Sequence, residues 1–171
     1  VSRLRSARPN LERTPPLAPE RAFLFGLHLL DRGNVKIWTG DRLAFEGYVR
    51  AGTLSMIDVA SEPSAVADGA HDQVLYYLPR AALDWLSHEN EGGESGDLLL
   101  PPGRNVSDPI VWHLTRALLP ALEHPEHVSQ LFFEHVALAF QEHVARSYAR
   151  LSRPMRPSAA ALAPWQVRRA K

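Results

Sequence analysis

The chain has 171 residues, of which 45% are hydrophobic, and this is enough material for one well-buried domain with tails. Its 19 basic and 19 acidic side chains balance, so no net charge draws it onto phosphate, and we expect this piece to bind DNA poorly. It has no cysteine, which excludes disulfides, thiolate catalysis and cysteine-based metal sites and agrees with a cytoplasmic location.

Residues 1–20 carry four arginines and four prolines and show little apolar periodicity, which predicts a flexible N-terminal arm. The same stretch lacks the apolar centre of a signal peptide. No run in the chain approaches the ~20 apolar residues that span a bilayer, so we expect no membrane partner.

Residues 21–88 predict a β-barrel core followed by a first helix. Apolar runs at 22–30 and 35–39 are joined by the turn sequence DRGN, which predicts a hairpin, and further strands are expected at 47–50, 53–59 and 73–78. Connections this short permit antiparallel neighbours only. The run at 22–30 is apolar on both faces, as expected for a strand inside a barrel or sandwich. From Pro79 the apolar spacing becomes helical.

Residues 89–148 predict a loop and the dimerisation helices. The loop at 89–107 is rich in glycine and proline. A second helix is expected from Asp108, as N-cap, to about residue 122, with Pro109 in its first turn and Pro120 bending or ending its last turn.

A third helix, at about 126–148, has two apolar faces at helical spacing. One face suffices to dock a helix on its own domain, and a second copy of the chain would cover the other. The alternative is a helix buried on both sides in one larger core. The residues expected to form the homodimer contact are Leu131, Phe132, His135, Leu138 and Ala139.

Residues 149–161 are basic and rich in proline and alanine, which is typical of a linker. Residues 162–171 (LAPWQVRRAK) predict the beginning of another helix, with Pro164 in its first turn. We expect this helix to continue beyond Lys171 in a longer protein.

Several motifs occur in a specific order: YYLPRAALDWL (76–86), DPIVWHLTRALLPAL (108–122), SQLFFEHVALAFQEHV (129–144) and LAPWQVRRAK. Over about residues 17–171 the sequence resembles the sensor half of AraC/XylS-type transcriptional regulators. The resemblance implies an α+β fold, an antiparallel cupin-like β-barrel or sandwich followed by two or three packed helices, which holds a small-molecule effector and forms a homodimer. DNA would be bound only through a C-terminal half whose helix-turn-helix motifs are missing here, because the sequence stops within the first helix of that half.

A small antiparallel barrel can enclose one ligand in a mostly apolar, aromatic-walled pocket. Strand side chains alternate, so about half of them face inward, and plain core packing is the alternative role for each. The expected ligand-binding residues are His28, Trp38, Tyr48, Met56 and Tyr77.

Motifs of catalysis and metal binding are not found in the sequence. The 8 histidines form neither the zinc-protease pattern nor the paired histidines and glutamate of catalytic cupins, and no serine lies in a nucleophile elbow. We therefore expect no catalytic residue, no metal, no cofactor and no enzyme. Two other functions stay open: a small cupin-like enzyme or metal-binding protein, and a stand-alone dimerisation module that pairs with full-length regulators.

Overall fold

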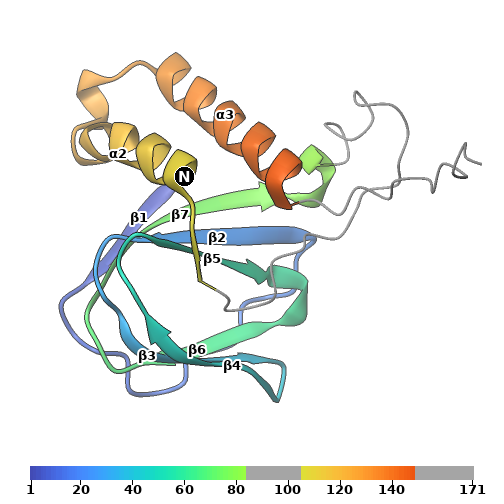
Figure 1. The fold of residues 1–171 in the computed structure, drawn as a ribbon. Coiled ribbons are helices and arrows are strands. Elements are labelled where there is room, and N and C mark those ends of the chain that lie inside the picture. The colour runs from blue at the N-terminus through green and yellow to red at the C-terminus, as the bar shows by residue number, and fades with distance from the viewer. Residues whose placement is uncertain (84–104, 149–171) are drawn as a thin grey trace, which may run out of the picture.

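The computed structural model describes residues 1–83 and 105–148, which form two antiparallel sheets with helices against one of them (Figure 1). The large sheet has the strand order β1-β7-β2-β5-β8 and the small sheet the order β4-β3-β6. The fold class is therefore α+β, as predicted, and the sheets make a sandwich. The strands are β1 (Ser2–Ser6), β2 (Ala22–His28), β3 (Gly33–Thr39), β4 (Arg42–Val49), β5 (Thr53–Asp58), β6 (Pro63–Ala67), β7 (His71–Pro79) and β8 (Val106–Ser107).

The strands β2, β3, β5 and β7 lie where the apolar runs predict them, but the hairpin predicted between β2 and β3 is wrong. The turn at Asp31–Asn34 carries the chain from the large sheet to the small one, where β3 pairs with β4 and β6 while β2 pairs with β5 and β7. β4 begins at Arg42, earlier than expected, because it forms a hairpin with β3 and pairs with that strand along its full length, from Gly33 to Thr39. β1, β6 and β8 were not predicted. β6 begins with Pro63, a residue that strands tolerate mainly at their first position or at a sheet edge, and β1 and β8 are short.

The helices follow the sheets. Residues 80–83 are helical, and α2 (Pro109–Glu123) begins at Asp108, whose carboxylate accepts the Ile110 and Val111 amides at 3.0 Å. Pro120 lies inside α2, and the helix ends three residues later. α3 (Gln130–Tyr148) starts later than predicted, because the short 3-10 helix η2 (Pro125–His127) and an extended Val128 come first.

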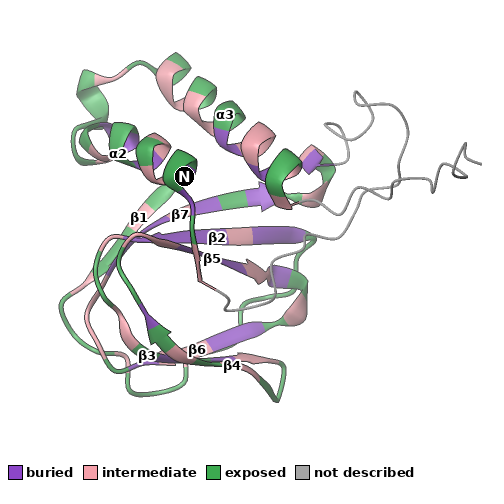
Figure 2. Ribbon diagram, in the orientation of Figure 1, coloured by how far each residue is buried: buried purple, intermediate pink, exposed green. Residues whose placement is uncertain are grey.

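The main core lies between the large sheet and the two helices, where Figure 2 shows buried residues along β2, β7 and the facing side of α3. Phe140 of α3 stacks on Tyr76 of β7 with ring centroids 3.9 Å apart, and it meets Phe25 of β2 edge-on at 5.5 Å. The Tyr76 hydroxyl is hydrogen-bonded to Thr115 of α2 at 2.7 Å. One strand pair is thereby fixed to both helices.

The N-terminal arm, expected to be flexible, lies along both sheets. β1 pairs with β7 at one edge of the large sheet. Further along, Asn10 and Ala67 exchange backbone hydrogen bonds of 2.9 Å. The Thr14 and Leu17 amides then donate to carbonyls of β6, those of Ala65 and Pro63 respectively, each at 3.0 Å. Unpaired strand edges offer free backbone groups, and the arm satisfies them.

Residues 84–104 and 149–171 are outside the described part of the chain. The expected linker at 149–161, the helix beginning at 162–171 and most of the loop at 89–107 therefore stay predictions. Among the described residues, no helix is both long enough and apolar enough to cross a membrane.

Candidate functional site

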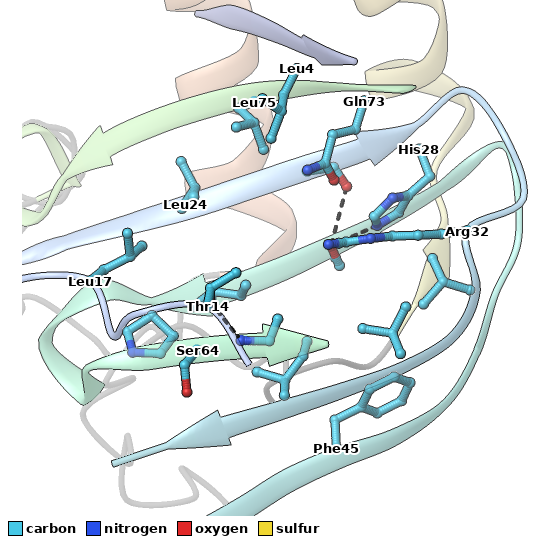
Figure 3. Close-up of a pocket in the computed structure, with 18 of the residues that line it drawn as sticks. Leu4, Thr14, Leu17, Leu24, His28, Arg32, Phe45, Ser64, Gln73 and Leu75 are labelled. Atoms are coloured by element: carbon cyan, nitrogen blue, oxygen red, sulfur yellow. Dashed lines mark hydrogen bonds between the residues drawn. The ribbon is translucent and has the colours of Figure 1, made fainter. Parts of the chain in front are cut away.

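A cavity of about 280 Å³ lies between the two sheets, on the side of the large sheet away from the helices (Figure 3). This volume is near the lower end of ligand pockets, which hold roughly 300–1,000 Å³. Both sheets, the N-terminal arm and two connecting segments line it. The lining residues are Leu4, Thr14, Pro15, Leu17, Leu24, Gly26, His28, Arg32, Val35, Ile37, Phe45, Val49, Ser55, Ile57, Pro63, Ser64, Ala65, Gln73, Leu75 and Asn105.

The space is hollow because the two faces of the large sheet carry side chains of different size. In β2, Phe23, Phe25 and Leu27 belong to the core beneath the helices. The alternate residues Leu24, Gly26 and His28 line the cavity. Gly26 places no side chain there, and Ser55 opposite it is short. The core is therefore filled on one face of the sheet and open on the other.

The N-terminal arm forms one wall of the cavity through Thr14, Pro15 and Leu17. Thr14 is held at both its amide and its hydroxyl: the amide donates to the Ala65 carbonyl, and the hydroxyl accepts the Ala65 amide, each at 3.0 Å. Arg13 donates from Nε to the Ser64 hydroxyl at 2.7 Å. These contacts seat the arm along β6 from one end of the wall to the other.

His28 is the titratable group deepest in the cavity wall, with 2% of its surface exposed. Its Nε2 lies 3.0 Å from the Ser55 hydroxyl, which also reaches the Gly26 carbonyl at 3.4 Å. Burial first, and then the charges of Arg32 and His71, together lower the pKa of His28 to about 4. His28 is therefore neutral at pH 7 and offers a hydrogen-bonding ring without a charge.

Arg32 reaches the cavity from the turn between β2 and β3, and Figure 3 shows its side chain beside the His28 ring. Two glycines fix this turn. Gly33 has a φ of 77°, and a Cβ on Gly69 would lie 2.5 Å from the Arg32 carbonyl oxygen. Burial lowers the pKa of Arg32 from 12.5, and its Nε is buried without a hydrogen-bond partner.

The five expected ligand-binding residues are not brought together. His28 lines the cavity, and the other four lie elsewhere. Met56 is buried in the core beneath the helices, and Trp38 lies under the Arg13 guanidinium at 4.9 Å. Tyr48 and Tyr77 are 52% and 45% exposed and donate hydrogen bonds to Asp31 and Glu20. Of the five, only His28 contributes to the site that the geometry offers.

Sequence reasoning missed Arg32, Gly26 and the wall made by the arm. Gly26 did carry a signal, since a glycine inside an apolar strand often marks close approach of a ligand or of another backbone. Arg32 lies in a turn sequence, and the alternation of strand side chains gives no signal for a turn side chain that reaches the pocket. The arm residues are far from the strands in the sequence and gave no signal.

The residues expected to form the dimer contact lie on the outer side of α3. Leu131 and Leu138 are 61% and 54% exposed, while Phe140 and Val144 on the opposite side are buried. His135 and Ala139 are also exposed, and Phe132 is half-buried beside the core. The described structure thus leaves apolar side chains of α3 uncovered.

A cluster of polar groups joins the start of α2 to the end of α3. The carboxylate Oδ2 of Asp108 accepts from Nε2 of His143 at 2.7 Å and from the Tyr148 hydroxyl at 2.5 Å. Burial tends to raise the pKa of Asp108, but the hydrogen bonds from Tyr148, the Val111 amide and His143 outweigh it and leave the pKa below 3.8. Asn105, three residues earlier, lines the cavity with its Oδ1 buried and unpartnered.

Potential metal ligands come together outside the cavity. In the described ranges, His124, Glu126 and His127 offer ligand atoms within 4.8 Å of one another, and all three are exposed on or next to η2. The His124 and His127 rings stack on each other with centroids 5.4 Å apart. Nothing in these contacts connects the group to the cavity between the sheets.

Comparison with known proteins finds similarity among solved structures. No protein-family model matches the chain, and no curated protein matches it. Among solved structures, the chain is similar to the crystal structure of the AraC-like transcriptional activator CuxR, with a TM-score of 0.48 and 12% sequence identity. The match covers 75% of this chain and 42% of that chain, so this chain spans less than half the length of the matched protein. A likeness at this level does not show the family.

Proposed function

We propose that this chain is the ligand-sensing and dimerisation domain of a transcriptional regulator. The observation that carries the proposal is the cavity of about 280 Å³ between the sheets, walled by both sheets and by the N-terminal arm. Its lining is mostly apolar with a few polar groups, which is the composition of small-molecule sites. The regulator class rests on the sequence motifs at 76–86 and 162–171.

Binding rather than catalysis is the role that the cavity supports. His28 is the one histidine among its described lining residues, and no aspartate or glutamate accompanies it. General acid–base catalysis needs a group whose pKa lies near the working pH, and burial holds that of His28 at about 4. A small molecule would be held there without being transformed.

Dimerisation through α3 is the second part of the proposal. Leu131 and Leu138 stand two turns apart on one side of the helix, with His135 between them. Exposed apolar side chains in a row favour burial against a symmetry-related copy. The opposite side of α3 is already buried in its own core, so the outer side is free to pair.

The segment after the cavity offers a route from ligand to dimer. Asn105 lines the cavity, β8 follows at once, and Asp108 then caps α2 and holds His143 and Tyr148 of α3. A ligand that binds Asn105 would favour one position of this short segment, and α3 would follow through Asp108. Such a ligand shifts the equilibrium only as far as its affinity differs between the two arrangements.

A reporter assay in bacterial cells tests the proposal. The full chain is fused ahead of a DNA-binding domain that represses its reporter only as a dimer, and a coiled-coil fusion serves as the positive control. We expect repression by the unaltered chain, and we expect a panel of small organic molecules to change it. A matched fusion carrying Ala65→Phe, which places a ring in the cavity, should repress but not respond.

The proposal fails if the fusion accumulates to the level of the coiled-coil control and does not repress the reporter. It also fails if the Ala65→Phe fusion responds to the same compounds as the unaltered chain. The first result removes dimerisation, and the second removes the cavity as the sensing site.

A further inference from the structure

Arg32 gives the cavity its one permanent charge among the described lining residues, because His28 is neutral at pH 7. Its Nε is buried and has no hydrogen-bond partner. Within residues 1–83 and 105–148 the guanidinium forms no ion pair, and it is not among the groups with further interactions. A positive charge therefore stands against an apolar cavity without a counter-charge from the described chain.

The carboxylates in the turns around Arg32 are already engaged. Asp31, its neighbour in sequence, accepts the Ala51 amide at 2.7 Å and the Tyr48 hydroxyl at 3.2 Å. Asp68, on the adjoining turn, accepts the amide of Asn34 at 2.7 Å and its side-chain nitrogen at 3.1 Å. Both acids stabilise the turns that carry Arg32 and leave its guanidinium unneutralised.

Arg32 is half-buried with its Nε fully enclosed, and a guanidinium in such a place without an anion is unfavourable, because burial removes water from the charge and nothing replaces it. The effect appears in the pKa of Arg32, which burial lowers, and in those of His28 and His71, which burial and the Arg32 charge lower together. An anion placed at the guanidinium would offset this. The planar guanidinium is suited to a carboxylate, since two parallel N–H bonds match its two oxygens.

The remaining walls of the cavity indicate the chemistry of the rest of such a ligand. Away from Arg32 the walls are mostly aliphatic or aromatic, with Leu24, Ile57 and Leu75 on the large sheet and Ile37 and Phe45 on the small one. Thr14 and Ser64 are uncharged polar residues of this part. No acid in the described lining would repel an anion. A molecule with one acidic end and an apolar remainder matches both regions.

We propose that the ligand of this cavity is a small apolar carboxylic acid, bound as its anion with the carboxylate on Arg32. This inference rests on the proposed function, because it names the chemical class that the same sensing site takes. Arg32 is then the residue that selects by charge, and the aliphatic walls select by size.

Matched probes on the full purified chain test the inference by isothermal titration calorimetry at pH 7. Hexanoate, hexan-1-ol and hexylammonium share one chain and differ in charge, and 3-phenylpropanoate with 3-phenylpropan-1-ol gives a second shape. We expect each acid to bind at least about tenfold more tightly than its alcohol, as expected for a hydrogen bond to a charged group, and hexylammonium to bind most weakly.

Variants show which residue causes the preference for the acid over the alcohol. Arg32→Gln should bring acid and alcohol to equal affinity, Arg32→Lys should keep part of the preference, and Arg50→Gln, at an exposed arginine on another turn, should leave it unchanged. Equal binding of acid and alcohol by the unaltered chain overturns the inference while leaving a ligand cavity. An unchanged preference in a folded Arg32→Gln chain overturns it too.

The same titrations distinguish failure of this inference from failure of the proposed function. If no acid and no alcohol binds the unaltered chain at millimolar concentration, the cavity is not a ligand site and both proposals fall. The comparison of probes on the unaltered chain decides the ligand class even where Arg32→Gln does not fold.

Discussion

Phe140 lies flat on Tyr76, with ring centroids 3.9 Å apart and ring planes 13° from parallel. Phe140 comes from α3 and Tyr76 from β7 of the large sheet, so this contact attaches α3 to a strand that lines the cavity. Phe140 is 2% exposed and Tyr76 1%. The stability of the helical layer should depend on this pair more than on any exposed position of α3.

Replacing Phe140 by alanine should lower the free energy of unfolding by about 3–5 kcal/mol, because it removes a buried ring and leaves a cavity behind. Tyr76→Phe should lower it by only about 1 kcal/mol, since Thr115 keeps its hydrogen bond to the Val111 carbonyl. Urea unfolding followed by circular dichroism measures both. Ile110→Ala, at an exposed position of α2, is the control and should change stability by less than about 0.5 kcal/mol. A loss that small for Phe140→Ala would contradict the packing described.

Asp108→Ala should destabilise the chain by about 2 kcal/mol or more, because α2 loses its N-cap and the half-buried Tyr148 hydroxyl loses its acceptor. Asp108→Asn keeps the cap but not the negative charge, so its loss should be smaller. Chemical unfolding of the three proteins at pH 7 measures the difference. Equal stability of Asp108→Ala and the unaltered chain would exclude the link between α2 and α3.

The Asp108 carboxylate should make the stability of the folded chain fall at acidic pH. The pKa of Asp108 is lowered from 3.8 in the folded chain, so its contribution is fully present above that value and is lost as the pH falls through the lower folded pKa. Thermal unfolding of the unaltered chain and of Asp108→Asn should therefore differ by a constant amount between pH 7 and 5 and converge below pH 3.8. A difference that stays constant down to pH 2.5 would contradict the prediction.

The buried His28 should make the fold less stable at a pH higher than the one at which Asp108 acts. Its folded pKa of about 4 is below the ordinary value of 6.5, so the unfolded chain takes up a proton first as the pH falls, and stability is lost between about pH 6.5 and 4. The full loss is roughly 3 kcal/mol at ~1.4 kcal/mol per pKa unit. A His28→Gln variant should lose less over this range, while His113→Gln, on the exposed part of α2, should behave as the unaltered chain. An NMR titration of the His28 ring with a midpoint near 6.5 would refute the burial argument.

Lysine at the outer face of α3 should abolish the proposed dimer without unfolding the chain. Leu131 and Leu138 are more than half exposed, so Leu131→Lys and Leu138→Lys remove little from the core of one subunit but place like charges opposite each other in a pair. Sedimentation velocity at increasing concentration measures the change. Leu43→Lys, at an equally apolar exposed position on β4, is the control and should leave the sedimentation coefficient unchanged. A monomer at all concentrations for the unaltered chain would exclude the proposed dimer.

The sequence predicted the strands and helices where apolar periodicity was strong. The buried run at β2 and the Asp108 cap of α2 lie where expected, because each depends on residues close together in the chain. β1 and the arm could not be found this way, since the edges that they cover are formed by β7 and β6, far later in the chain. Their own composition, rich in arginine and proline, indicated only an arm.

The cavity was harder to predict than the fold. Alternation along β2 separates the Phe23, Phe25 and Leu27 side from the Leu24, Gly26 and His28 side, but it does not say which side meets the helices. The structure shows that the bulky side does. The four expected ligand residues that lie elsewhere are large, with Met56 in the core and Tyr48 and Tyr77 at the surface, while Gly26 and Ser55 are among the small residues that leave the space open.

The wall made by residues 14–17 has a kinetic consequence. The backbone bonds that hold this segment to β6 are few, so its local opening needs far less free energy than unfolding of the central strands. A molecule inside the sandwich would then be able to leave whenever this segment lifts from β6, and its residence time would depend on how often the segment opens as well as on the strength of its own contacts. Hydrogen exchange at the Thr14 amide would report how readily the segment opens.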